Sequence, residues 1–375
     1  MKVLVVFSFG YSLDTWRAAG NLKRELEYYK YFSKTYKTKF YFITYGNQSD
    51  YDLIKDYSDY IEVFPAYEYI SLSKFKIINL LKSFYLPFKL KNILRSYDLI
   101  KANQLTAFWT ALIFKIIVKK PLITKTGFDA FIFAKNEKKP LYKIVIFYFL
   151  TQIALIFSDN YLASSKNDIK FIKSKYFFTR KLLYRPNWVY VNYLSLEEER
   201  KKNKILMVGR LVDQKNYEYA LDLVKNSKYE IDIVGSGELK NSIKELSKKL
   251  NIKVNFLGKF DYNDLIKLYP RYKYFLLTSK FEGNPKVLLE ALSSRCIVIV
   301  SNIENNLEII SDGQNGIVLD INKAPIKISS LLDDNILNYN FESIKLNSIK
   351  TIENDYSFEK ALIQEYEDFV NLINS

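Results

Sequence analysis

The chain has 375 residues, of which 49% are hydrophobic and 26% are charged, a globular composition with enough length for two domains. It has no histidine and one cysteine, Cys296, which excludes serine–histidine triads, HExxH zinc proteases and internal disulfides. Its net charge of +15 comes from residues 1–200, with 32 Lys/Arg against 17 Asp/Glu, because residues 201–375 carry 24 of each. The basic half predicts an anionic partner: nucleic acid, lipid headgroups or a phosphorylated substrate.

Short β-rich runs alternate with helical patterns along the first half. The predicted strands cover residues 2–9, 39–46, 60–66, 97–103, 120–127 and 160–165. Near-continuous apolar runs of this length are typical of buried parallel strands. The alternation therefore predicts an open parallel sheet wound on both sides. The first run has one lysine and no cleavage site, so we expect no secretory signal and a cytoplasmic protein.

The most apolar stretch of the chain covers residues 144–158 and is interrupted by Thr151 and Gln152. A membrane-spanning helix needs about 20 apolar residues. This stretch is shorter, so we expect a buried helix.

The strand pattern breaks near Arg185 and restarts after a charged run. Further strands are predicted at 205–210, 229–237, 253–260, 272–279, 296–302 and 316–321, followed by an amphipathic helix at 355–373 capped by Asp355 or Ser357. We thus expect an N-terminal Rossmann-like domain at 1–187, a linker at 188–203, a C-terminal Rossmann-like domain at 204–350 and a C-terminal helix within 351–375. Two such α/β domains would face a central cleft at the carboxyl ends of both sheets, where ligands bind.

Glycine is scarce, with 11 residues in all, and most of the glycines between 209 and 316 follow predicted strands. Those at strand ends are Gly209, Gly235, Gly237, Gly258, Gly283 and Gly313. They would let a phosphate or ribose approach the backbone, or they are ordinary turn residues. In the same region Arg210 follows a strand and Lys215 precedes a helix. Two cations there suit a diphosphate, although a surface salt bridge and a solvated lysine would fit the spacing too.

The segment 279–310 carries the strongest signal. A loop with Glu282, Gly283 and Asn284 leads through Pro285 into a helix rich in Leu and Val. The free amides of Lys286, Val287 and Leu288 would favour an anion. Glu282 in the loop and Glu290 in the helix would face one pocket and bind sugar or ribose hydroxyls. The alternative is that Glu282 caps the helix and Glu290 is exposed.

These residues resemble the two-glutamate signature of the family 4 glycosyltransferases, which have the two-domain GT-B fold. GRLVDQKN (209–216), IVGSGELK (233–240) and DGQNGIVL (312–319) resemble further elements of that family, and the first half is similar to a subgroup with a G-x-S-x-x-x-W-x-x-x-G start. The C-terminal helix resembles the one that in this fold crosses back to the first domain. Where relatives have glycines near 304–305, this chain has Glu304 and Asn305.

The resemblance implies retaining transfer of a sugar from a nucleotide sugar, without an obligatory metal or cofactor. Arg210 and Lys215 would hold the diphosphate, Glu282 the sugar, and Glu290 the ribose. The catalytic set would be Glu282, Arg210 and Lys215. The donor-binding set would add Gly10, Gly209, Gly235, Gly258, Gly283, Asn284, Val287, Leu288 and Glu290. Candidates on the acceptor side are Asn103, Gln104, Gly127 and Asp129.

In this fold the first domain holds the acceptor, which gives its positive charge a role. Residues 74–96 mix Lys89, Lys91 and Arg95 with Phe84 and Phe88, as a membrane-surface helix or a helix pair split by Pro87 would. The hypothesis is a saccharide or polyprenyl-linked acceptor at an anionic membrane surface, in cell-surface polysaccharide assembly. A solvated lysine face fits the pattern as well.

Two other functions remain as alternatives. A GT-B nucleotide-sugar epimerase would keep the fold, but such enzymes rely on histidines that this chain lacks. A basic nucleic-acid-binding protein would fit the charge, but no RNP-like, helix-turn-helix or zinc pattern appears, so we expect no nucleic-acid partner.

Overall fold

The computed structural model describes residues 1–92, 96–179, 181–191, 200–333 and 339–375. The chain forms two units, one of Met1–Arg185 with Leu362–Ser375 and one of Pro186–Ala361. The first boundary lies two residues before the expected end of the N-terminal domain. The expected linker joins the second unit as far as it is described, and its residues 192–199 lie outside the described residues.

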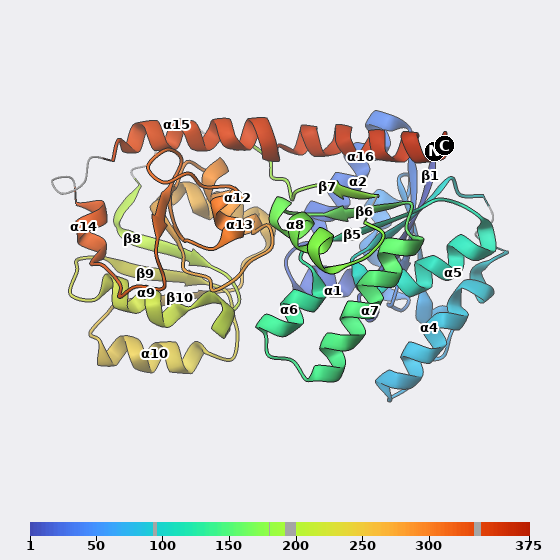
Figure 1. Cartoon of the computed structure of the whole chain (residues 1–375), viewed down its shortest axis with the longest axis horizontal. Coiled ribbons are helices and arrows are strands. Elements are labelled where there is room, and N and C mark those ends of the chain that lie inside the picture. The colour runs from blue at the N-terminus through green and yellow to red at the C-terminus, as the bar shows by residue number, and fades with distance from the viewer. Residues whose placement is uncertain (93–95, 180, 192–199, 334–338) are drawn as a thin grey trace. The chain divides into compact units, whose positions relative to one another are not determined.

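Both units are built on parallel sheets (Figure 1). Among the described residues, one sheet has the order β3-β2-β1-β4-β5-β6-β7 and the other β10-β9-β8-β11-β12-β13. The strands are β1 (Lys2–Phe7), β2 (Lys39–Thr44), β3 (Ile61–Pro65), β4 (Leu99–Asn103), β5 (Leu122–Thr126), β6 (Asn160–Ala163), β7 (Leu182–Tyr184), β8 (Lys201–Val208), β9 (Glu230–Val234), β10 (Val254–Gly258), β11 (Tyr272–Leu277), β12 (Ile297–Ser301) and β13 (Ile317–Leu319). The prediction of two doubly wound Rossmann-like units is confirmed.

Helices connect these strands and cover the sheets. They are α1 (Leu13–Ala18), α2 (Leu22–Tyr36), α3 (Ser49–Leu53), α4 (Lys76–Leu90), α5 (Phe108–Val118), α6 (Ala130–Asn136), α7 (Leu141–Phe157), α8 (Lys166–Lys175), α9 (Tyr217–Val224), α10 (Lys240–Lys249), α11 (Tyr262–Leu268), α12 (Lys286–Ser293), α13 (Glu304–Leu307), α14 (Ile328–Leu332), α15 (Phe341–Thr351) and α16 (Phe358–Ile373). The amide of Lys360 donates to the Ser357 hydroxyl at 3.4 Å. Of the two predicted caps of α16, Ser357 is therefore the one that makes this contact.

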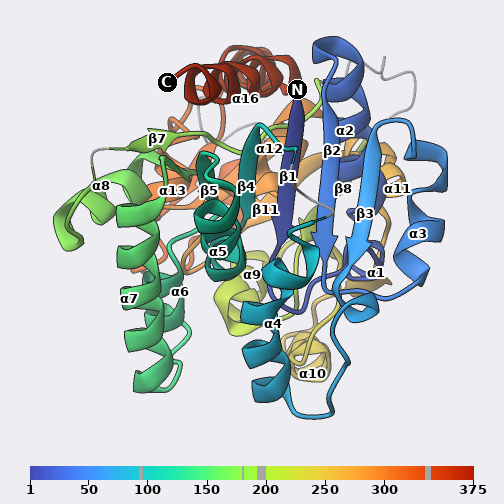
Figure 2. The same cartoon turned by 90° about the vertical axis from the view of Figure 1, so that its right-hand side faces the viewer.

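The first sheet is covered on two faces. On one face, side chains of β1 and β4 such as Leu4 and Ala102 pack with α4, α5, α7 and α8 in a single apolar cluster. On the other face, rings from the strands meet α2, as in the contact between Phe32 and Phe40 of β2 at 5.4 Å, and Phe32 in turn contacts Phe369 of α16 at 5.6 Å (Figure 2). Tyr36 and Tyr366 stack at 4.0 Å between these two helices.

Buried charges join α16 to the first unit. The Lys101 ammonium on β4 pairs with the Glu365 carboxylate, which also accepts a hydrogen bond of 2.6 Å from the Tyr28 hydroxyl on α2. Arg185 donates two hydrogen bonds, of 2.7 and 2.6 Å, to Asp368 one turn further along α16. Removing one partner of a buried ion pair is strongly destabilising, because the other charge is left uncompensated. These contacts therefore fix where α16 lies on the first unit.

The apolar stretch predicted as a buried helix differs from the expectation. It forms α7, but half of its apolar side chains are exposed, including Ile146 at 56% and Phe149 at 57%, while Ala154 and Leu155 pack in the core. Hydropathy alone does not reveal whether another layer covers a helix, which is why the prediction was wrong. No helix in the described part of the chain is long and apolar enough to cross a bilayer.

The basic segment near residue 80 forms one helix rather than a pair. Pro87 lies inside α4, where its ring is buried and the helix continues to Leu90. Arg95 of this predicted segment lies outside the described residues.

Candidate active site

The candidate site lies in the second unit, where the sheet reverses its strand order. β8 and β11 are neighbours, and the chain leaves them towards opposite sides of the sheet. Ligands in open α/β sheets bind at this switch point, outside the carboxyl ends of the strands. Arg210 and Lys215 follow β8, and Glu282 follows β11. The topology therefore brings together residues separated by about 70 positions in the sequence.

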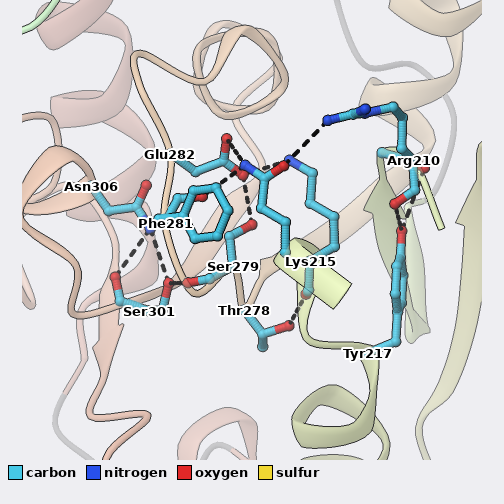
Figure 3. A network of polar contacts seen from close by, with 11 residues as sticks. Arg210, Lys215, Tyr217, Thr278, Ser279, Phe281, Glu282, Ser301 and Asn306 are labelled. Atoms are coloured by element: carbon cyan, nitrogen blue, oxygen red, sulfur yellow. Dashed lines mark hydrogen bonds and ion pairs between the residues drawn. The ribbon is translucent and has the colours of Figure 1, made fainter. Parts of the chain in front are cut away.

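An ion pair forms the centre of the site (Figure 3). The Lys215 ammonium lies 2.5 Å from a Glu282 carboxylate oxygen, and the two side chains are only 13% and 9% exposed. The Ser279 hydroxyl donates to the same oxygen at 2.6 Å. The strand ends are tied together too, because the Thr278 hydroxyl donates to the Lys215 carbonyl at 3.0 Å. The predicted catalytic residues Lys215 and Glu282 are thus in direct contact.

Gln214 links the two loops and was missed in the sequence analysis. Its side-chain amide donates to the Phe281 carbonyl at 2.8 Å and lies 3.5 Å from a Glu282 oxygen. Its own backbone carbonyl accepts from the Lys280 amide at 2.8 Å. These contacts hold the Glu282 loop against the loop that follows β8. Only the position of Gln214 between two predicted cations could have drawn attention to it.

Arg210 projects from the opposite side of this cluster. It is exposed, and its guanidinium donates to the Gln214 side chain at 3.4 Å. Below it the buried Tyr217 hydroxyl donates to the Gly209 and Arg210 carbonyls at 3.4 and 3.3 Å. Burial, and secondarily the Glu282 carboxylate, raise the pKa of Tyr217. The hydroxyl therefore stays protonated and keeps the strand end in place.

The loop before α12 is fixed from two sides. Asn187 and Asn284 exchange hydrogen bonds between side chain and backbone at 3.0 and 2.6 Å. The Asn305 side chain donates to the Gly283 carbonyl at 2.8 Å. Asn305 stands where the resembled family has glycine, and in this chain its side-chain amide holds the loop before α12 in place.

The start of α12 offers its backbone rather than its side chains. Pro285 is the N-cap, one residue before the predicted first turn, and no described side chain caps the helix. Leu288 is buried in the core of the unit and Val287 packs against that core. Any part of Val287 in donor binding would therefore fall to its amide, whereas the Leu288 amide already donates to the Pro285 carbonyl at 3.1 Å.

Glu290 lies apart from the Lys215 pair. It is 3% exposed, and its carboxylate accepts a hydrogen bond of 2.9 Å from the buried Tyr269 hydroxyl. Burial and Glu290 raise the pKa of Tyr269 well above its ordinary value, so the tyrosine remains the donor. The structure thus places the two glutamates in different surroundings, and Glu290 is not an exposed helical carboxylate.

Four of the predicted glycines, Gly10, Gly235, Gly258 and Gly313, have positive φ angles, at which a side chain would be strained. A Cβ atom on Gly235, whose φ is +143°, would lie 1.9 Å from the Gly209 carbonyl oxygen. The neighbouring β8 and β9 ends can therefore meet only if residue 235 lacks a side chain. Gly258 ends β10 with a φ of +80°.

The predicted residues of the first unit gather at the switch point between β1 and β4. Gly10, with a φ of +78°, follows β1. Asn103 ends β4, and its carbonyl accepts from the Ser8 hydroxyl at 3.2 Å. The Gln104 side chain accepts from the Gly127 amide at 3.2 Å. The four predicted residues Gly10, Asn103, Gln104 and Gly127 therefore lie at the carboxyl ends of β1, β4 and β5.

Asp129 is oriented differently from its neighbours. It is fully buried, caps α6 by accepting from the Ile132 amide at 2.9 Å, and receives the Tyr176 hydroxyl at 3.3 Å. Burial raises the pKa of its carboxyl group, and these hydrogen bonds partly oppose the shift. The structure gives Asp129 contacts that hold the loop, not contacts at the surface.

Comparisons with known proteins identify the class of this site. Residues 195–345 match the family described as glycosyl transferases group 1, so the second unit carries a domain of that family. The two Rossmann-like units and this domain define the protein as a glycosyltransferase with the GT-B fold.

Curated relatives point the same way. The chain is 25% identical over 247 residues to the capsular polysaccharide biosynthesis glycosyltransferase CapH of Staphylococcus aureus, covering 61% of this chain and 67% of that protein. It is 28% identical over 259 residues, 67% of this chain and 68% of that protein, to a Campylobacter jejuni α-1,4-N-acetyl-D-galactosaminyltransferase named for a diphosphoundecaprenol-linked saccharide. Anabaena HepE, solved with UDP and glucose, has a TM-score of 0.74 and 17% identity, with 99% of this chain and 100% of that chain covered; this likeness supports the fold alone.

Proposed function

We propose that the protein transfers a sugar, with retention of anomeric configuration, from a nucleoside diphosphate sugar to a lipid-linked saccharide. This reaction would belong to cell-surface polysaccharide assembly. The Lys215–Glu282 pair at the switch point carries the proposal. The printed names of the curated relatives support it, because they include capsule synthesis and a diphosphoundecaprenol-linked substrate.

In this proposal Lys215 and Arg210 bind the donor diphosphate. A diphosphate would enter next to a cation that already faces a carboxylate, so Lys215 would share its three N–H donors between phosphate oxygens and Glu282. The exposed Arg210 side chain can add a bidentate contact. Both cations would stabilise the charge that builds up on the departing diphosphate.

Glu282 is proposed to orient the donor sugar. Lys215 and Ser279 hold one carboxylate oxygen, and Gln214 lies beside the other. A carboxylate positioned in this way can accept hydrogen bonds from sugar hydroxyls. Glu290 is proposed to bind the ribose. This role requires the buried Glu290 carboxylate to become reachable when the donor binds.

We further propose that no divalent metal is obligatory, because cations of the chain itself would neutralise the diphosphate. The protein would act at the cytoplasmic face of an anionic membrane, where a polyprenyl-linked acceptor lies. Exposed apolar and basic residues of α4 support this location.

The test is donor binding measured by thermal unfolding with UDP or GDP. A ligand present at about 100 times its Kd should stabilise the fold by about 2.7 kcal/mol. We expect Lys215→Met to lose this stabilisation. The matched control is Lys280→Met, because Lys280 lies in the neighbouring loop but pairs with the exposed Asp213 at 2.6 Å.

Transfer assays complete the test. Losing Lys215 should lower kcat by about 100-fold to 1,000-fold, and Glu282→Gln should also reduce transfer strongly, whereas Lys280→Met should act like the parent protein. Nuclear magnetic resonance of the product tests retention, and assays with EDTA test the metal. Wild-type turnover in Lys215→Met with unchanged nucleotide binding would contradict the proposed roles.

A further inference from the structure

An apolar stripe runs along the whole outer face of α7. Its exposed side chains recur every three or four residues and are Leu141, Tyr142, Val145, Ile146, Phe149, Ile153, Ile156 and Phe157. Their exposed fractions range from 40% to 75%. The surface of a folded protein rarely presents so many large apolar side chains in one row. The stripe is therefore a candidate contact surface.

The loop after α8 extends this stripe. The Gln152 side chain on α7 donates to the Phe177 carbonyl and accepts from the Phe177 amide, both at 2.9 Å. This pair of bonds holds the loop against α7. Phe177 and Phe178 are 70% and 73% exposed, and Phe178 has a φ of +57°, a conformation that bulky residues rarely adopt. The loop thus displays two rings beside the helix.

A second stripe lies on α4. Ile77, Leu81, Tyr85 and Phe88 follow one another at helical spacing and are 48% to 64% exposed. The inner sides of α4 and α7 pack into the same core cluster on one face of the sheet. Figure 2 shows both helices on that side, extending beyond the ends of the strands. Their outer faces therefore belong to one side of the first unit.

Lysines predominate in and beside both helices. Residues 69–97 contain five lysines and no acidic residue, and residues 138–158 contain three lysines and no acidic residue. Lys138 and Lys143 are exposed at the start of α7. The nearby acid Glu137 is paired with Lys139 at 3.2 Å. An apolar stripe bordered by cations matches an anionic lipid surface, whereas a second copy of the chain would bring like charges together.

We propose that α7, the loop at 177–178 and α4 together form a surface that docks on anionic lipid, with α7 lying in the plane of the headgroups. This deepens the proposed membrane location, because it adds a helix and a loop to the contact and names the lipid charge. A helix in this position buries its apolar face while lysines meet the phosphates.

The experiment measures co-sedimentation of the full chain with vesicles of phosphatidylcholine, with and without phosphatidylglycerol. We expect binding to the phosphatidylglycerol vesicles that weakens as salt increases. Phe149→Glu on α7 and Leu81→Glu on α4 should each lower the apparent affinity by at least about tenfold. The matched control is Leu346→Glu on α15 of the second unit, which is equally exposed at 61% and should bind like the parent.

A charge variant makes the test independent of apolar substitutions that impair folding. Replacing Lys138 and Lys143 by Gln, at exposed positions, should lower binding roughly thirtyfold at low salt. Equal binding to both vesicle types, or parent-like binding by Phe149→Glu, would overturn the proposal. So would a dimer in solution that Phe149→Glu converts to a monomer, because the surface would then belong to a second copy.

These measurements are separate from the proposed reaction. The vesicles contain neither donor nor acceptor, so a failure of docking says nothing about transfer. Conversely, Phe149→Glu should keep the parent's activity on a water-soluble acceptor and its stabilisation by nucleotide.

Discussion

Glu365→Gln should destabilise the first unit by about 3–5 kcal/mol, because it leaves a buried ammonium without its counter-charge. The Lys101 side chain is 4% exposed and that of Glu365 11%. Although burial alone lowers the pKa of Lys101, the Glu365 carboxylate raises it above its ordinary value. Lys101 therefore stays charged in the folded protein, and the substitution isolates that charge.

Replacing the lysine of this pair, as in Lys101→Met, should lower the free energy of unfolding by less than Glu365→Gln does. Burial raises the pKa of Glu365, but Lys101 and then Lys125 hold it below its ordinary value. Two lysines thus act on one carboxylate. Lys101→Met still leaves Glu365 with Lys125 nearby and with the 2.6 Å hydrogen bond from Tyr28. The double variant Lys101→Met/Glu365→Leu should be more stable than Glu365→Gln, because it removes both charges.

Urea unfolding followed by tryptophan fluorescence can measure this effect in the first unit. Trp16 and Trp109 lie in that unit, whereas Trp188 lies in the second, so a Trp188→Phe background restricts the signal to the unit of interest. Lowering the pH should also destabilise the first unit. The stabilisation that Glu365 provides is present above the ordinary carboxyl pKa, and it is lost as pH falls through the lowered pKa of Glu365 in the folded protein. A loss below about 1 kcal/mol in Glu365→Gln, the range of an exposed pair, would refute the reasoning.

Three further predictions concern the second unit. Gln214→Leu should lower kcat/KM about tenfold, because the Glu282 loop loses the hydrogen bonds that hold it. Gln214→Glu should lower kcat/KM further, because it places a second negative charge beside the Glu282 carboxylate. Steady-state kinetics that match the parent would argue against this positioning role. Gly235→Ala should cost more than about 2 kcal/mol in unfolding free energy, since its Cβ would lie 1.9 Å from the Gly209 oxygen; an unchanged Tm would show that the strands can separate. Burial raises the pKa of the Cys296 thiol to about 12, so thiol reagents should label it in denaturant but not in the folded protein at mildly alkaline pH.

The strands were predictable because buried parallel strands are continuous apolar runs, and each predicted strand overlaps an observed one. β7 was missed because its three residues, Leu182–Tyr184, are too few to form a pattern. Lys215 and Glu282 could be paired only through a resemblance, since no local pattern connects residues 67 positions apart.

Other features depend on tertiary contacts that local sequence does not encode. Gln214 acts through a loop on the neighbouring strand, and Asp129 points inward because α6 and Tyr176 surround it. The exposure of α7 depends on the absence of a covering layer among the described residues, which the hydropathy of residues 144–158 cannot indicate. Sequence reasoning therefore identified the loops of the candidate site but not the side chains that hold those loops.

The route of the chain through α16 has a practical consequence for dissecting the enzyme. The last residues of this helix belong to the first unit, although its first turn belongs to the second. A fragment ending at Arg185 would lack Glu365 and Asp368, which are the acidic partners of Lys101 and Arg185. A gene that joins residue 375 to residue 1 through a short spacer would instead encode the first unit as one uninterrupted polypeptide, and such a circular permutant is the natural starting point for preparing the two halves separately.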